Sequence, residues 1–74
     1  MSYSSVKSLV CVGGTLNGSR ARVGFQDIHY NRRSGELYCL RQLSVRYPVI
    51  GVRQVEVLVL SGISDADAVK ELEL

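Results

Sequence analysis

His29 is the only histidine of the chain, and its side chain is the one best suited to proton transfer near neutral pH. Asp27 precedes it by two positions and Cys39 falls in the next apolar segment, so a Cys–His pair can be considered. Neither His29 nor Asp27 stands beside a nucleophile in a recognisable turn. One histidine with dispersed acids also lacks the three or four ligands that a metal site needs. We therefore expect no enzyme activity, no metal and no other cofactor.

Glycines are concentrated in the segment Gly13-Gly14-Thr15-Leu16-Asn17-Gly18. A P-loop would close with Gly-Lys-Ser or Gly-Lys-Thr, and a dinucleotide-binding loop would lead into a helix. Here Ser19-Arg20 leads into a strand-like segment instead. We expect these glycines to serve the geometry of a turn, in which Asn-Gly tolerates positive φ angles.

Arginine accounts for seven of the nine basic side chains, and its planar guanidinium binds phosphates, carboxylates and base edges. Two arginines share one face of a predicted strand, two lie in a predicted turn, and tyrosines lie nearby in the sequence. A basic sheet with aromatic side chains can bind single-stranded nucleic acid through phosphate contacts and stacking, although no RNP, helix-turn-helix or KH signature is present. The alternative is a solvated face whose arginines protect sheet edges. The candidate contacts, for nucleic acid or for a protein partner, are Arg20, Arg22, Tyr30, Arg32, Arg33 and Tyr38.

Charge is divided unevenly along the chain. Residues 1–53 carry eight basic and two acidic side chains, a net of +6, whereas residues 54–74 carry one basic and five acidic side chains, a net of −4. Such asymmetry favours interaction with partners over chemistry.

The length of 74 residues predicts a single domain, 1–74, near the size at which one core is only just sufficient. No apolar run approaches the roughly 20 residues of a membrane span, and the start, residues 1–7, lacks the layout of a signal peptide. We therefore expect a cytoplasmic protein without a membrane partner. Cys11 and Cys39 lie in apolar runs and are expected to be buried thiols, with a cross-strand disulfide or a reactive thiol as alternatives.

Alternating apolar residues predict four strands followed by one helix. The predicted strands are residues 6–12, 20–30, 36–46 and 52–60. Within 20–30 the apolar parity slips, which predicts a β-bulge at Gly24 or at Gln26-Asp27. Asn31 to Gly35 is a predicted turn, and Pro48 with Gly51 is a predicted break.

The helix is expected to begin after Ser64, because Ser64 and Asp67 have the spacing of a capping box. The predicted fold is α+β: a small antiparallel sheet of three to five strands with one C-terminal helix packed on a face. The predicted core is Val10, Val23, Phe25, Leu37, Cys39, Leu43, Val55, Val57, Val59, Val69 and Leu72.

Three motifs together resemble small proteins of tailed phages and prophages. They are the Gly13–Gly18 element, the hairpin Tyr30 to Tyr38 with Gly35-Glu36-Leu37, and the closing Gly62-Ile63-Ser64-Asp65-Ala66-Asp67-Ala68. Those proteins often open with Gly-Gly-Pro-Leu-Asp-Gly, where this chain has Thr15 and Asn17. The resemblance implies a non-enzymatic accessory protein or an inhibitor of a host protein, and it assigns no site residues.

Several apolar side chains point away from the predicted core, because the strands carry apolar residues on both parities. Left exposed, they would form a patch of the kind that marks an interface. A homodimer would bury that patch and stabilise a small domain. The candidate self-association residues are Leu9, Leu40 and Leu58, with Cys11, Tyr38 and Leu60 on the same parity.

Overall fold

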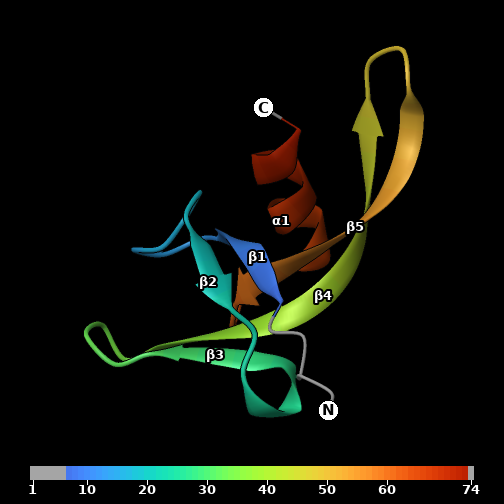
Figure 1. Cartoon of the computed structure of the whole chain (residues 1–74). Helices are drawn as coiled ribbons and strands as arrows, with labels where there is room; N and C mark the ends of the chain where they lie inside the picture. Colours follow the sequence, from blue (N-terminus) through green and yellow to red (C-terminus); the bar gives the residue numbers. More distant parts are fainter. Residues whose placement is uncertain (1–6, 74) are drawn as a thin grey trace, which may run out of the picture.

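The computed structural model describes residues 7–73, and within them five strands form one mostly antiparallel open sheet that a C-terminal helix covers on one face (Figure 1). A 3-10 turn, η1 (Phe25–Asp27), separates β2 from β3. The order across the sheet is β2-β1-β5-β4-β3. The predicted α+β class is confirmed, although β1 and β5 run parallel. The elements are β1 (Ser8–Val12), β2 (Arg20–Arg22), β3 (Ile28–Asn31), β4 (Glu36–Tyr47), β5 (Gly51–Leu60) and α1 (Asp65–Leu72).

The long hairpin of β4 and β5 dominates the sheet, with paired residues from Tyr38↔Leu60 to Tyr47↔Gly51. Its neighbours are short. β3 pairs with β4 only as far as Cys39, and β1 pairs with β5 only at Leu58 and Val59. Residues 40–57, which we call the arm, therefore form a ribbon whose two strands pair only with each other. Its outer end stands clear of the rest of the molecule (yellow to orange in Figure 1).

The helix begins where its local sequence predicts. Ser64 Oγ accepts a hydrogen bond from the Asp67 backbone N–H at 3.2 Å, which satisfies one of the free donors of the first turn. Arg41 and Asp65 form an ion pair at 2.7 Å between β4 and the start of the helix. At the other end, Glu73 accepts the Arg46 backbone N–H at 3.1 Å. The helix is thus fastened along β4, from Arg41 near the base of the arm to Arg46 near its outer end.

Beneath the helix lies the first of two apolar clusters. It contains the predicted core residues Leu43, Val57 and Val59, with Val55, Val69 and Leu72 packed against it. Its buried part has three further members that are absent from the predicted core: Val12, Val45 and Ala68.

A second apolar cluster lies on the opposite face of the sheet, and it corrects the expected self-association patch. Leu58 has no exposed surface, and Leu9 and Leu40 are half-buried against the same cluster. The chain itself supplies the cover, because β2 and the 13–19 loop fold over this face and contribute Leu16, Ala21 and Val23. The apolar residues on this parity are therefore core residues of one chain, so they give no argument for a dimer.

Phe25 is not a core residue, and the single predicted strand 20–30 is wrong. Phe25 is 85% exposed, because the chain leaves β2 after Arg22 and turns through η1 before β3 begins. Gln26 and Asp27 both have positive φ angles, 60° and 61°, so the parity slip marks a reversal between two strands instead of a bulge within one. Of the first predicted strand, Val6 lies outside the described residues.

Both cysteines are free thiols. Cys11 is buried, and burial raises the pKa of its thiol, whereas Cys39 is only half-buried. Within residues 7–73, no helix is long and apolar enough to cross a membrane.

Candidate functional site

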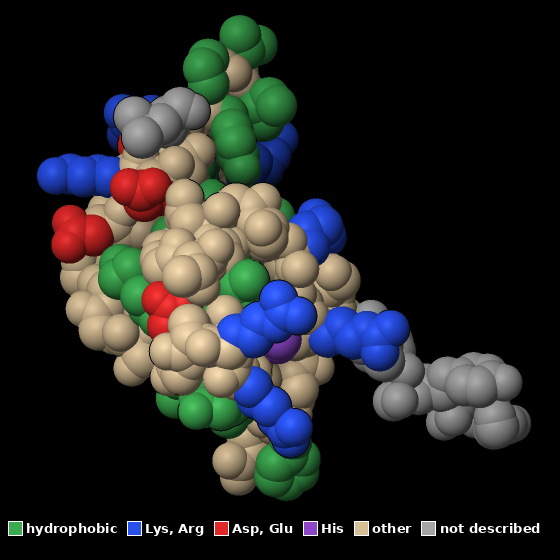
Figure 2. Space-filling model, turned by 90° about the vertical axis from the view of Figure 1, so that its left-hand side faces the viewer, with side chains coloured by type: hydrophobic (Ala, Val, Ile, Leu, Met, Phe, Trp, Pro, Cys, Tyr) green, Lys and Arg blue, Asp and Glu red, His purple; other side chains and the backbone are tan. Residues whose placement is uncertain are grey.

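The predicted arginine surface draws on two separate segments of the chain. Arg20 and Arg22 lie on the edge strand β2, and Arg32 and Arg33 lie in the turn between β3 and β4; all four are exposed. Figure 2 shows basic side chains gathered around the single histidine. Tyr30 at the end of β3 is 55% exposed and supplies an aromatic ring beside the turn. Five of the six predicted contacts are therefore accessible to a partner.

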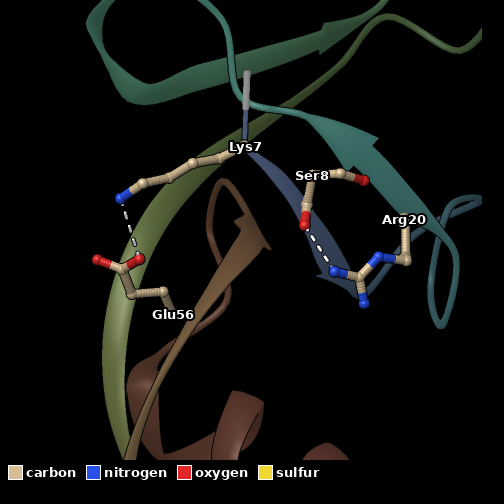
Figure 3. A network of polar contacts seen from close by, with 4 residues as sticks. All are labelled: Lys7, Ser8, Arg20 and Glu56. Atoms are coloured by element: carbon tan, nitrogen blue, oxygen red, sulfur yellow. Dashed lines mark hydrogen bonds and ion pairs between the residues drawn. The ribbon is translucent and has the colours of Figure 1, made fainter. Parts of the chain in front are cut away.

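Contacts within the chain already occupy some of the basic groups. Arg20 turns back on β1, where its Nη2 donates to the Ser8 carbonyl oxygen at 2.7 Å (Figure 3). In the same view Lys7 forms an ion pair with Glu56 of β5 at 3.3 Å. These contacts hold the edge of the sheet in place and reduce the number of donors that Arg20 offers to a phosphate.

His29 has a structural partner. Its Nδ1 lies 3.0 Å from the Arg22 carbonyl oxygen, and because a carbonyl only accepts, this nitrogen carries the proton and donates it. The bond ties β3 to β2, the two outer strands of the sheet, across the 3-10 turn. The His29 ring also lies against the Tyr38 ring, with centroids 6.5 Å apart. These contacts give His29 a structural role between β2 and β3.

The prediction of Tyr38 as a stacking residue is wrong. Its side chain has no exposed surface, and its hydroxyl donates to the Gly13 carbonyl oxygen at 2.8 Å and accepts the Leu16 N–H at 3.2 Å. Burial raises the pKa of this hydroxyl. A buried ring with both hydrogen-bonding roles used cannot stack on a base, so Tyr38 is a core residue that holds the glycine loop.

Glu36 fastens that loop from the other side. Its Oε1 accepts from the Thr15 hydroxyl at 2.6 Å and from the Ser34 hydroxyl at 2.8 Å, and Asn31 donates to the same Thr15 hydroxyl at 3.2 Å. The bonds from Thr15, and then from Ser34, lower the pKa of the Glu36 carboxyl. Gly14, at φ +66°, has Glu36 and Tyr38 where a Cβ would stand. The glycine loop is therefore packed against the hairpin, as its expected turn role requires.

An apolar tip at the end of the arm is the most unusual surface feature, and sequence reasoning missed it. We call residues 47–52 the tip; Val49 is fully exposed and Ile50 is 58% exposed. The Ile50 N–H donates to the Pro48 carbonyl oxygen at 2.7 Å, so Val49 is the centre of a γ-turn, with φ at +73°. This turn is rare and strained, and a β-branched residue at positive φ is an outlier. The available signal was an apolar Val-Ile pair at a break where polar residues are usual.

Arginines flank the tip. Arg46 precedes it on β4 and Arg53 follows it on β5, and both side chains are exposed. In Figure 2 the apolar end of the arm stands at the top, with basic side chains beside it and acidic side chains lower on the left. The exposed outer face of the ribbon is otherwise polar, with a Gln54 to Ser44 hydrogen bond across its strands.

A cavity of about 410 Å³ lies beside the helix, at the end of β5 away from the tip. Its walls combine loop backbone, one aliphatic side chain and two carboxylates. Across residues 7–73, no three His, Cys, Asp or Glu side chains are grouped as metal ligands would be. The cavity is lined by Gly13, Gly14, Asn17, Ile63, Asp67 and Glu71.

Comparison of the chain with protein-family models, curated proteins and solved structures finds no match. The geometry of its own residues is therefore the basis for any functional assignment.

Proposed function

We propose that the protein is a small non-enzymatic binding protein that contacts another protein through the tip of its arm. The resemblance to small phage and prophage proteins favours an accessory protein or an inhibitor that acts on a bacterial host protein, or on a phage protein, in the cytoplasm. No cofactor is part of this proposal.

The exposed apolar tip carries the proposal. Val49 and Ile50 contribute nothing to either apolar cluster, and Val49 adopts a strained turn that Gly or Asn would accept more readily. Folding therefore gives no reason for these residue types. Strain and exposed apolar surface that do not serve the core are features of contact sites.

The position of the tip supports the same reading. A two-stranded ribbon that extends beyond its neighbours can enter a concavity on a larger protein, and the other exposed side chains of the ribbon are mostly polar. Arg46 and Arg53 on either side would add contacts at the rim of such an interface, where charge mainly affects association rate and specificity.

Pull-down from bacterial lysate followed by mass spectrometry tests the proposal. The wild type is compared with Ile50→Ser, which removes apolar surface from the tip, and with Phe25→Ser, which removes an exposed aromatic ring elsewhere. We expect one protein to be enriched by the wild type and by Phe25→Ser but lost with Ile50→Ser. Equal recovery by all three variants would contradict a role for the tip.

Binding of single-stranded nucleic acid is the second candidate, and the exposed Tyr30 beside Arg32 and Arg33 favours it. Phosphate contacts make affinity fall with salt, and each lost contact lowers the log–log slope by about one. The double change Arg32→Ala with Arg33→Ala should therefore weaken oligonucleotide binding and reduce the slope by about two. Affinity that ignores both salt and these arginines would remove this candidate.

A further inference from the structure

Two surfaces at opposite ends of β5 have opposite curvature. The tip, where β5 begins at Gly51, is a convex apolar projection. The cavity beyond Leu60, where β5 ends, is concave. Ile63 provides the aliphatic part of its wall and packs so closely on Gly13 that a Cβ there would collide with it. A volume of about 410 Å³ falls within the usual range of binding pockets and can accept aliphatic side chains.

The charges of the two surfaces are also complementary. Arg46 and Arg53 stand beside the tip, whereas Asp67 and Glu71 stand at the cavity, one helical turn apart on α1. In the described part of the chain, the ion pairs are Lys7–Glu56 and Arg41–Asp65, so Arg53, Asp67 and Glu71 form none there. Two carboxylates at this spacing repel each other, and a guanidinium placed near them would relieve that repulsion.

We propose that the arm tip of one copy of this chain docks in the cavity of a second copy, and that the exchange is reciprocal about a two-fold axis. The inference rests on the proposed function, because it takes the tip as a binding surface. It adds that the tip of a second copy occupies the cavity.

Symmetry favours the reciprocal arrangement, because it uses the same contact between tip and cavity twice. A two-fold exchange closes after two copies, while a single head-to-tail contact would leave an open chain.

A charge-reversal exchange tests the pairing. Sedimentation equilibrium at tens of micromolar should give the wild type a mass of about 16 kDa, twice the 8.2 kDa of one chain. Arg53→Glu and Glu71→Arg alone should each raise the dimer dissociation constant at least tenfold, because each places like charges together. An equimolar mixture of the two should recover the wild-type constant, since both contacts of the mixed dimer then pair opposite charges.

Arg32→Glu, the same reversal in the β3–β4 turn, is the matched control and should leave the dimer intact. A wild-type mass of 8.2 kDa that does not change with concentration overturns the proposal. A dimer that persists in both single variants, or a mixture that fails to recover, overturns it equally.

The proposed function can fail or succeed independently. Glu71→Arg changes the cavity and leaves the tip intact, so it should be monomeric and still recover a lysate partner. Ile50→Ser changes the tip and should lose both the dimer and the partner. If the wild type dimerises and the variants behave as expected, but no lysate partner is found, only the reciprocal docking is supported. If the wild type is monomeric and captures a partner through its tip, only the proposed function is supported.

Discussion

Val49→Gly is the substitution that separates the roles of the tip in folding and in binding. Most valine truncations destabilise a small domain, but this side chain is fully exposed and belongs to neither apolar cluster. Its loss therefore removes no buried area. Its backbone has a φ of +73°, a conformation that glycine adopts without steric cost.

Two opposing effects set the change in the free energy of unfolding. Relief of a left-handed backbone at an L-residue contributes about 1–2 kcal/mol. The extra freedom that glycine gives the unfolded chain costs about 0.4–1 kcal/mol. The free energy of unfolding should consequently stay the same or rise, by about 0–1.5 kcal/mol. Val49→Gly should also weaken the binding of a partner to the tip, because an apolar contact is lost.

Urea denaturation of the variant and the wild type measures the change, with Val45→Ala as the control. Val45 is the same residue type four positions earlier on the arm, but it is fully buried under the helix. Its truncation should cost more than about 1.5 kcal/mol, at roughly 0.8 kcal/mol for each buried CH₂ equivalent plus a cavity term. A loss of more than 1 kcal/mol in Val49→Gly, at about the size of the control, would mean that Val49 serves folding and that the tip is not built for contact.

Three other substitutions or conditions test the fold. Phe25→Ala should change the free energy of unfolding by less than about 0.5 kcal/mol in chemical denaturation, since the ring is 85% exposed. Leu58→Ala, which empties a fully buried site, should cost about 2–5 kcal/mol, much of the stability of so small a domain, and calorimetry should show a large fall in Tm. The hydrogen bonds of Glu36 lower its pKa in the folded state, so their stabilisation is complete above the ordinary value of 4.5 and is lost as pH falls through the lower folded-state pKa. Glu36→Gln should flatten this acid limb of a stability–pH profile, and an unchanged limb would contradict the role of that carboxylate.

Local signals explain which parts of the fold were predictable. Ser64 and Asp67 lie three residues apart, and Ser64 caps the helix by accepting the Asp67 N–H, because capping depends on adjacent backbone alone. The turn from Asn31 to Gly35 follows the same logic: Asn31 Oδ1 accepts the Arg33 N–H, and Gly35 takes a positive φ of 77°.

Long-range packing explains what the sequence could not indicate. Tyr38 was predicted as a surface ring, but its hydroxyl partners come from a loop more than twenty positions earlier in the chain. Leu58 was predicted to lie uncovered, because the pattern along one strand does not reveal that β2 folds over its face. The arginine surface was predictable because charged side chains stay exposed in most folds. The exposure of the tip was not predictable, since apolar residues in a sequence normally indicate burial.

Site-specific photo-crosslinking tests most directly whether the tip is the binding surface. A benzophenone amino acid is placed at Ile50, or at Phe25 as an exposed control position, and each purified protein is irradiated in bacterial lysate. We predict a discrete adduct, to a partner or to a second copy, from position 50 and none from position 25. Equal adducts from both positions, or none from position 50 while the wild type still captures a partner, would contradict it.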